Sequence, residues 1–125
     1  MSFEEADGYL LVRFKGDWTP DGVRQAIEDV AKRAQDQGYT RILVDARKLS
    51  APTTGFHRFL AGQDAAKIWG HPLKVAAVYP GELIDKFVET TAVNRGANLV
   101  VLSDVDAALS WLMESPANES NATSG

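Results

Sequence analysis

The sequence contains no cysteine, so the fold uses neither disulfide bonds nor thiolate metal ligands, and no thiol can act as a nucleophile. Its two histidines, His57 and His71, lack the i, i+4 spacing of a helical metal site. The glycines do not spell a dinucleotide-binding or phosphate-loop fingerprint. We therefore expect no metal and no cofactor.

Positive charge is also scarce, since 13 Lys and Arg residues face 17 Asp and Glu residues, for a net charge of −4. This balance argues against a surface built to neutralise nucleic-acid phosphates. No apolar run approaches the roughly 20 residues of a membrane span, so no transmembrane segment is expected. The start of the chain carries acids where a signal peptide needs a basic region. These features predict a cytoplasmic protein.

A chain of 125 residues with 45% hydrophobic residues is expected to form a single domain. We place the domain at residues 1–113. From Glu114 onward the composition turns to Ser, Asn, Ala, Pro and Gly, which predicts a disordered tail over residues 114–125.

The first elements are marked by turn and capping residues. Asp7-Gly8 is a tight-turn signal that would join a short strand at residues 2–6 to a strand at residues 9–15. Thr19 as N-cap and Pro20 at the first helical position predict a helix, and Gly38 predicts its end.

Strands and helices then alternate. Apolar runs predict strands at 42–44, 75–79 and 99–102, the first two central, and apolar spacing predicts helices over 56–70 and 84–96. Ser103 with Asp106 predicts a capping-box start for a last helix. The fold class is therefore a single-domain α/β layered fold, with a mixed sheet of about five strands, parallel later strands and about four helices.

Several short motifs occur in this order: Gly8-Tyr-Leu-Leu-Val-Arg-Phe-Lys-Gly-Asp-Trp18, Leu43-Val-Asp45, Lys74-Val-Ala-Ala-Val, Asn94-Arg-Gly-Ala-Asn98 and Asp106-Ala-Ala-Leu-Ser-Trp-Leu112. The order of elements resembles the STAS-type domain of anti-sigma-factor antagonists. The motifs are more similar to the SpoIIAA-like group of small bacterial proteins, which is related to the CRAL-TRIO lipid-carrier fold. The resemblance covers about residues 3–113 and implies a regulatory, protein-binding role without enzymatic activity.

The resemblance also implies a site of phosphorylation. In anti-sigma-factor antagonists the phosphorylated Ser lies in an Asp-Ser-Ser-Gly or similar motif, where a helix begins after the Asp-bearing strand. The matching segment here is Pro52-Thr53-Thr54-Gly55, which puts Thr53 at the acceptor position, with Pro52 in place of the Asp. Thr53, Thr54 and the nearby Ser50 are the candidate phosphoacceptor or docking residues. Helix capping explains the same residue types without a partner, so both interpretations stay open.

Charged residues surround this junction. Asp45 follows the 42–44 strand and would either act as an acid or base or hold the following polar loop through backbone N–H groups. Arg47 and Arg58 are candidate partners for an anion at the helix N-terminus. The carboxyl ends of strands in an open α/β sheet are where ligands bind.

Aromatic residues offer a second candidate site. Four aromatic side chains are expected on the two helices that flank a crevice at the topological switch point of the sheet, namely Phe56, Phe59, Trp69 and Phe87. There they would either fill the core or line an apolar pocket. Each tryptophan, including Trp18 and Trp111, is expected to cover a core edge with its N–H exposed to water.

Three function classes follow. The first is a regulatory module whose surface around residues 51–59 docks a protein partner. The second is a binder of a small apolar, lipid-like ligand in a helix-lined crevice. An enzyme comes third, because no nucleophile has a base fixed beside it by spacing. The oligomeric state is left open, with a homodimer among the options.

Overall fold

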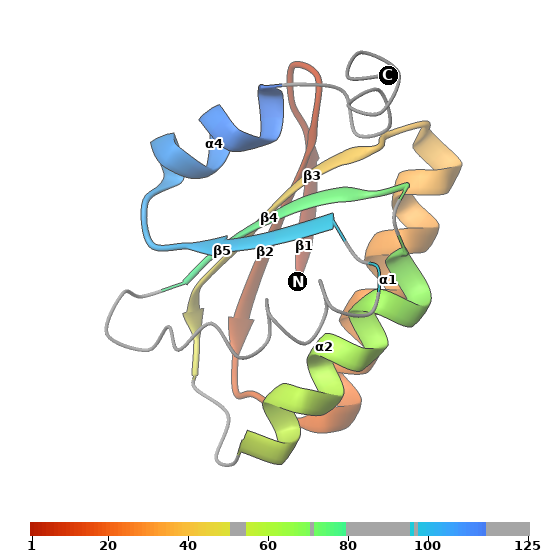
Figure 1. Cartoon of the computed structure of the whole chain (residues 1–125), viewed down its shortest axis with the longest axis vertical. Coiled ribbons are helices and arrows are strands. Elements are labelled where there is room, and N and C mark those ends of the chain that lie inside the picture. Colours follow the sequence, from red (N-terminus) through yellow and green to blue (C-terminus); the bar gives the residue numbers. More distant parts are fainter. Residues whose placement is uncertain (51–54, 71, 80–95, 97, 115–125) are drawn as a thin grey trace.

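A computed structural model of the chain describes residues 1–50, 55–70, 72–79, 96 and 98–114, without the side chains of 55–60. Five strands form one sheet in the order β1-β2-β3-β4-β5 (Figure 1). They are β1 Ser2–Glu5, β2 Leu10–Gly16, β3 Arg41–Leu49, β4 Lys74–Val78 and β5 Asn98–Leu102. β1 is antiparallel to β2 and every other pair is parallel, which confirms the mixed five-strand sheet.

Three helices occur among the described residues: α1 Pro20–Gln37, α2 Gly55–Trp69 and α4 Val105–Met113. Figure 1 shows α1 and α2 side by side on one face of the sheet and α4 on the other. None of the described helices is long and apolar enough to cross a membrane. The helix expected over residues 84–96 lies almost wholly outside the described residues.

Two apolar clusters explain this layering. Leu10, Ile42 and Val75 of the sheet pack with the stripe of α1 that includes Val30 and Ala34. Because side chains alternate along a strand, the next residues face the other way. The second cluster accordingly joins Leu43, Ala76 and Val78 to Ala108 and Leu112 of α4.

The local signals at the start of the chain are confirmed. The side chain of Thr19 accepts a hydrogen bond from the Gly22 N–H at 3.1 Å, and Gly38 ends α1 with φ 78°. Gly8 has φ 87° in the turn between β1 and β2, a conformation that glycine adopts without steric cost.

Two boundaries were predicted wrongly. The N-cap of α4 is Asp104, whose side chain accepts from the Asp106 N–H, and not Ser103. Both residue types cap well, so propensity could not choose between them. The polar loop expected after Asp45 is strand as far as Leu49, because Ala46 and Leu49 are buried in the sheet.

Candidate functional site

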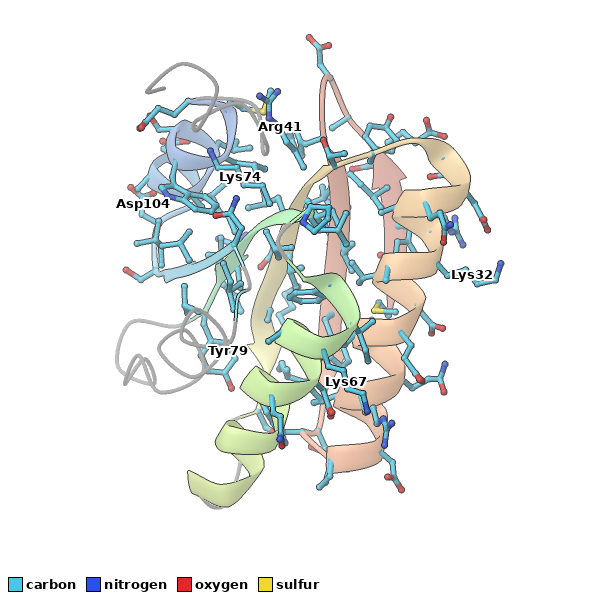
Figure 2. All side chains as sticks on the ribbon, turned by 45° about the vertical axis from the view of Figure 1, so that its right-hand side comes forward. Lys32, Arg41, Lys67, Lys74, Tyr79 and Asp104 are labelled. Carbon is cyan, nitrogen blue, oxygen red and sulfur yellow. The ribbon has the colours of Figure 1, made fainter. Side chains whose placement is uncertain are left out.

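The carboxyl ends of β2, β3 and β4 are tied together at Ser50. The Ser50 N–H donates to the carbonyl of Gly16 at 2.8 Å, and the Trp18 N–H donates to Ser50 Oγ at 2.9 Å. From the other side, the Tyr79 hydroxyl donates to the Ser50 carbonyl at 2.7 Å. Figure 2 shows Tyr79 at the opposite end of the sheet from Arg41 and Lys74. We call Gly16, Trp18, Ser50 and Tyr79 the Ser50 clamp.

The clamp gives Ser50 a structural task at the start of the segment that leads to α2. Its backbone N–H and carbonyl and its hydroxyl oxygen each take part in one of the three hydrogen bonds. A phosphate on Ser50 would have to displace the Trp18 N–H from that oxygen. Sequence reasoning missed Tyr79, because a partner 29 residues away gives no local signal.

Asp45 and Arg47 form a closed pair on β3. Arg47 Nε donates to Asp45 Oδ1 at 2.9 Å and Nη2 donates to Oδ2 at 2.8 Å, while the Arg47 N–H also donates to Oδ1 at 3.2 Å. The β2–β3 register shifts at this point, since Arg13 pairs with Asp45 but Lys15 pairs with Lys48. One extra residue on β3 makes this a bulge, which re-aims side chains.

The pair fixes the charge of both partners. Hydrogen bonding to the Arg47 side chain lowers the pKa of Asp45 below its ordinary value, and the same contact raises the pKa of Arg47. Asp45 is therefore held as a carboxylate, which suits a structural anion better than a general acid. Arg47 already has an anionic partner within its own strand, so an incoming phosphate would compete with Asp45.

Other candidate residues fall beyond what the structure describes. Thr53, Thr54 and Phe87 lie outside the described residues, and so do the side chains of Phe56, Arg58 and Phe59.

Two tryptophans correct the expectation of a water-exposed N–H. Trp69 is partly buried against the α1–α2 core, and its Nε1–H donates to the Ile27 carbonyl of α1 at 2.9 Å. It therefore packs between α1 and α2. The Trp18 Nε1–H is buried and has no hydrogen-bond acceptor among the described residues.

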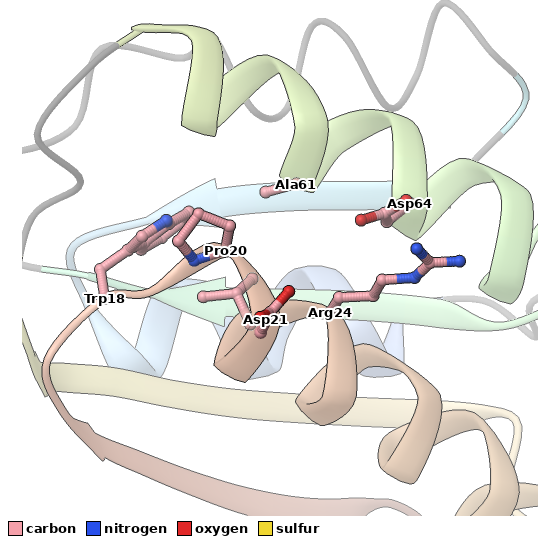
Figure 3. Close-up of a pocket in the computed structure, with 7 residues that line it drawn as sticks. Trp18, Pro20, Asp21, Arg24, Ala61 and Asp64 are labelled. Atoms are coloured by element: carbon pink, nitrogen blue, oxygen red, sulfur yellow. The ribbon is translucent and has the colours of Figure 1, made fainter.

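A small cavity lies between the first turn of α1 and the middle of α2 (Figure 3). Its volume is about 160 Å³, and its lining includes Trp18, Pro20, Arg24 and Asp64. Drug-sized ligands occupy pockets of roughly 300–1,000 Å³, so this cavity suits a single side chain better than a lipid. Sequence reasoning missed it, because its two walls come from separate helices.

The described strands contain no topological switch point, the place where the ligand crevice was expected. Such a crevice needs a reversal of strand order, whereas these strands follow one another in chain order. Among the described residues, no group of three or more His, Cys, Asp or Glu side chains could hold a metal ion.

The backbone resembles that of a protein of known structure. The crystal structure of an anti-sigma factor antagonist from Mycobacterium paratuberculosis superposes with a TM-score of 0.63 at 16% sequence identity. The match covers 90% of this chain and 92% of that one. The chain has the fold of an anti-sigma factor antagonist. At the level of the fold, the resemblance to STAS-type domains is thus confirmed, while the sequence matches no family model and no curated protein.

Proposed function

We propose that this STAS-like protein is a non-enzymatic regulatory module that binds a protein partner. The observation that carries the proposal is the likeness over nine-tenths of the chain to a protein described as an anti-sigma factor antagonist. Because the match spans both chains almost completely, it compares whole domains and not one shared motif.

The carboxyl edge of the sheet offers the docking surface. Arg47, Lys48 and Ser50 are exposed there, and the clamp fixes Ser50 through three hydrogen bonds. A preorganised surface of this kind loses less entropy on binding than a flexible one. We call Asp17, Trp18, Arg47, Lys48, Ser50 and Tyr79 the docking edge.

Regulation would act beside this edge. Thr53, with Thr54 as the alternative, is the proposed phosphoacceptor, because α2 begins at Gly55 and a helix N-terminus favours an added phosphate. Arg58 is the proposed cationic contact for that phosphate. The added negative charge would change how the docking edge meets its partner.

The test compares the wild type with Thr53→Asp and Thr53→Ala in pull-downs from native lysate, each protein also being melted. Thr40→Asp is the matched control, since Thr40 is exposed just before β3 at the opposite edge of the sheet. We expect Thr53→Asp to lose or gain a partner that Thr53→Ala and Thr40→Asp bind as wild type does. Identical partners for all four proteins, or a Thr53→Asp protein that no longer folds, would leave Thr53 as an ordinary helix cap.

A further inference from the structure

The cavity between α1 and α2 adjoins the docking edge through Trp18. The indole of Trp18 lines the cavity, while the backbone N–H of the same residue donates to Ser50 Oγ. An extended partner segment lying on the docking edge would therefore pass the mouth of the cavity. This continuity makes the cavity a candidate anchor point for the partner, and so the inference rests on the proposed function.

The cavity has an apolar end and a charged end. Figure 3 shows Trp18 beside Pro20 at one end, with Asp64 and Arg24 at the other. The described lining also includes Val23, Ala61 and Asp21. A ligand that fits both ends needs an apolar stem and a polar head.

The described lining as a whole carries more acidic than basic groups. Two carboxylates, Asp21 and Asp64, face a single guanidinium, that of Arg24. No ion pair within 4.0 Å joins Arg24 to either carboxylate among the described residues. Among the described lining residues one negative charge is in excess, on a chain whose own net charge is −4. A cationic head is therefore favoured over an anionic one.

We propose that the cavity receives an arginine side chain of the protein partner. Its methylene stem would lie against Trp18 and Pro20, and its planar guanidinium would form two parallel hydrogen bonds with the Asp64 carboxylate, a geometry that an ammonium group does not reproduce. A volume of about 160 Å³ accommodates one long side chain and excludes a lipid or a cofactor.

The experiment titrates the full chain with N-acetyl-arginine methylamide and follows amide and indole N–H signals by NMR. The uncharged isostere N-acetyl-citrulline methylamide and N-acetyl-lysine methylamide are the comparison ligands. Asp64→Asn and Asp21→Asn remove one carboxylate each. Asp36→Asn is the matched control, because it makes the same change near the other end of α1, where Asp36 only pairs with the exposed Lys32.

We expect saturable shifts of the Trp18 indole and the Ala61 amide, with a dissociation constant on the order of 1 mM. Asp64→Asn should weaken binding about tenfold, while Asp36→Asn should change it less than about twofold. Absence of saturation, equal binding of citrulline or lysine, or unchanged binding by both Asp64→Asn and Asp21→Asn would each overturn the proposal. Such a failure is distinguishable from failure of the proposed function, which is judged by the Thr53-dependent partner in the pull-down.

Discussion

Replacing Ser50 by alanine tests whether the clamp stabilises the docking edge. The change removes the acceptor of the 2.9 Å bond from the Trp18 N–H. It keeps the bonds that use the Ser50 backbone, from Tyr79 and to Gly16. One hydrogen bond contributes about 0.5–1.5 kcal/mol net, and this one is exposed, so water can partly replace it. We expect the free energy of unfolding to fall by about 1 kcal/mol.

Urea unfolding measures that loss, and hydrogen exchange locates it. A loss of about 1 kcal/mol corresponds to about fivefold faster exchange of the Trp18 amide. The matched control is Ser103→Ala, an exposed serine that follows β5 at the same edge of the sheet, where we expect almost no change. If Ser50→Ala matched Ser103→Ala in both measurements, the clamp would not stabilise the docking edge.

Three further predictions concern stability. Leu112→Ala should lower the free energy of unfolding in urea by about 3–5 kcal/mol, because Leu112 is 0% exposed. Leu109→Ala should lower it less, because Leu109 is only partly buried. Equal losses for the two variants would contradict the burial pattern. Asp45→Asn should lower stability at pH 7 by about 1 kcal/mol. The pKa of Asp45 is lowered in the folded state, so the carboxylate stabilises the fold above about pH 3.9, and this stabilisation is lost as the pH falls through the pKa of the folded state. The urea midpoints of the variant and the wild type should therefore converge in acid. Burial lowers the pKa of Lys74 in the folded state, so the unfolded chain binds the proton more readily. Wild-type stability should therefore rise with pH up to about 10.4. Urea unfolding of Lys74→Met should lack this rise, and an equal rise in both proteins would show that another group causes it.

Most of the fold could be predicted because its signals are local. Thr19, Pro20 and Gly38 specify the ends of α1 through backbone groups within one helical turn. The apolar runs of β3 and β4 need cover on both faces, which two layers of helices supply. Where two local signals competed, as at Ser103 and Asp104, the sequence alone could not decide.

The buried Lys74 shows what local patterns miss. It precedes an apolar run, and its exposure is only 6%, although lysine is almost never fully buried without a partner. Its Nζ lies 4.5 Å from the centroid of the Trp111 ring on α4, so a residue 37 positions later gives the ammonium one of its contacts. That contact depends on how α4 crosses the sheet.

The candidate site could be predicted by position but not by its contacts. A strand that ends near Ser50 before a helix marks the junction, and parallel topology brings other carboxyl ends to the same edge. Which side chains meet there depends on the register of three strands, and the bulge in β3 shifts that register by one residue. With this shift Gly16 is paired with Leu49, which brings Trp18 to Ser50. Tyr79 reaches Ser50 from the end of β4, whose register with β3 is unbroken. A site assembled from three strand ends is therefore a property of the sheet, and residue types at the junction alone could not reveal it.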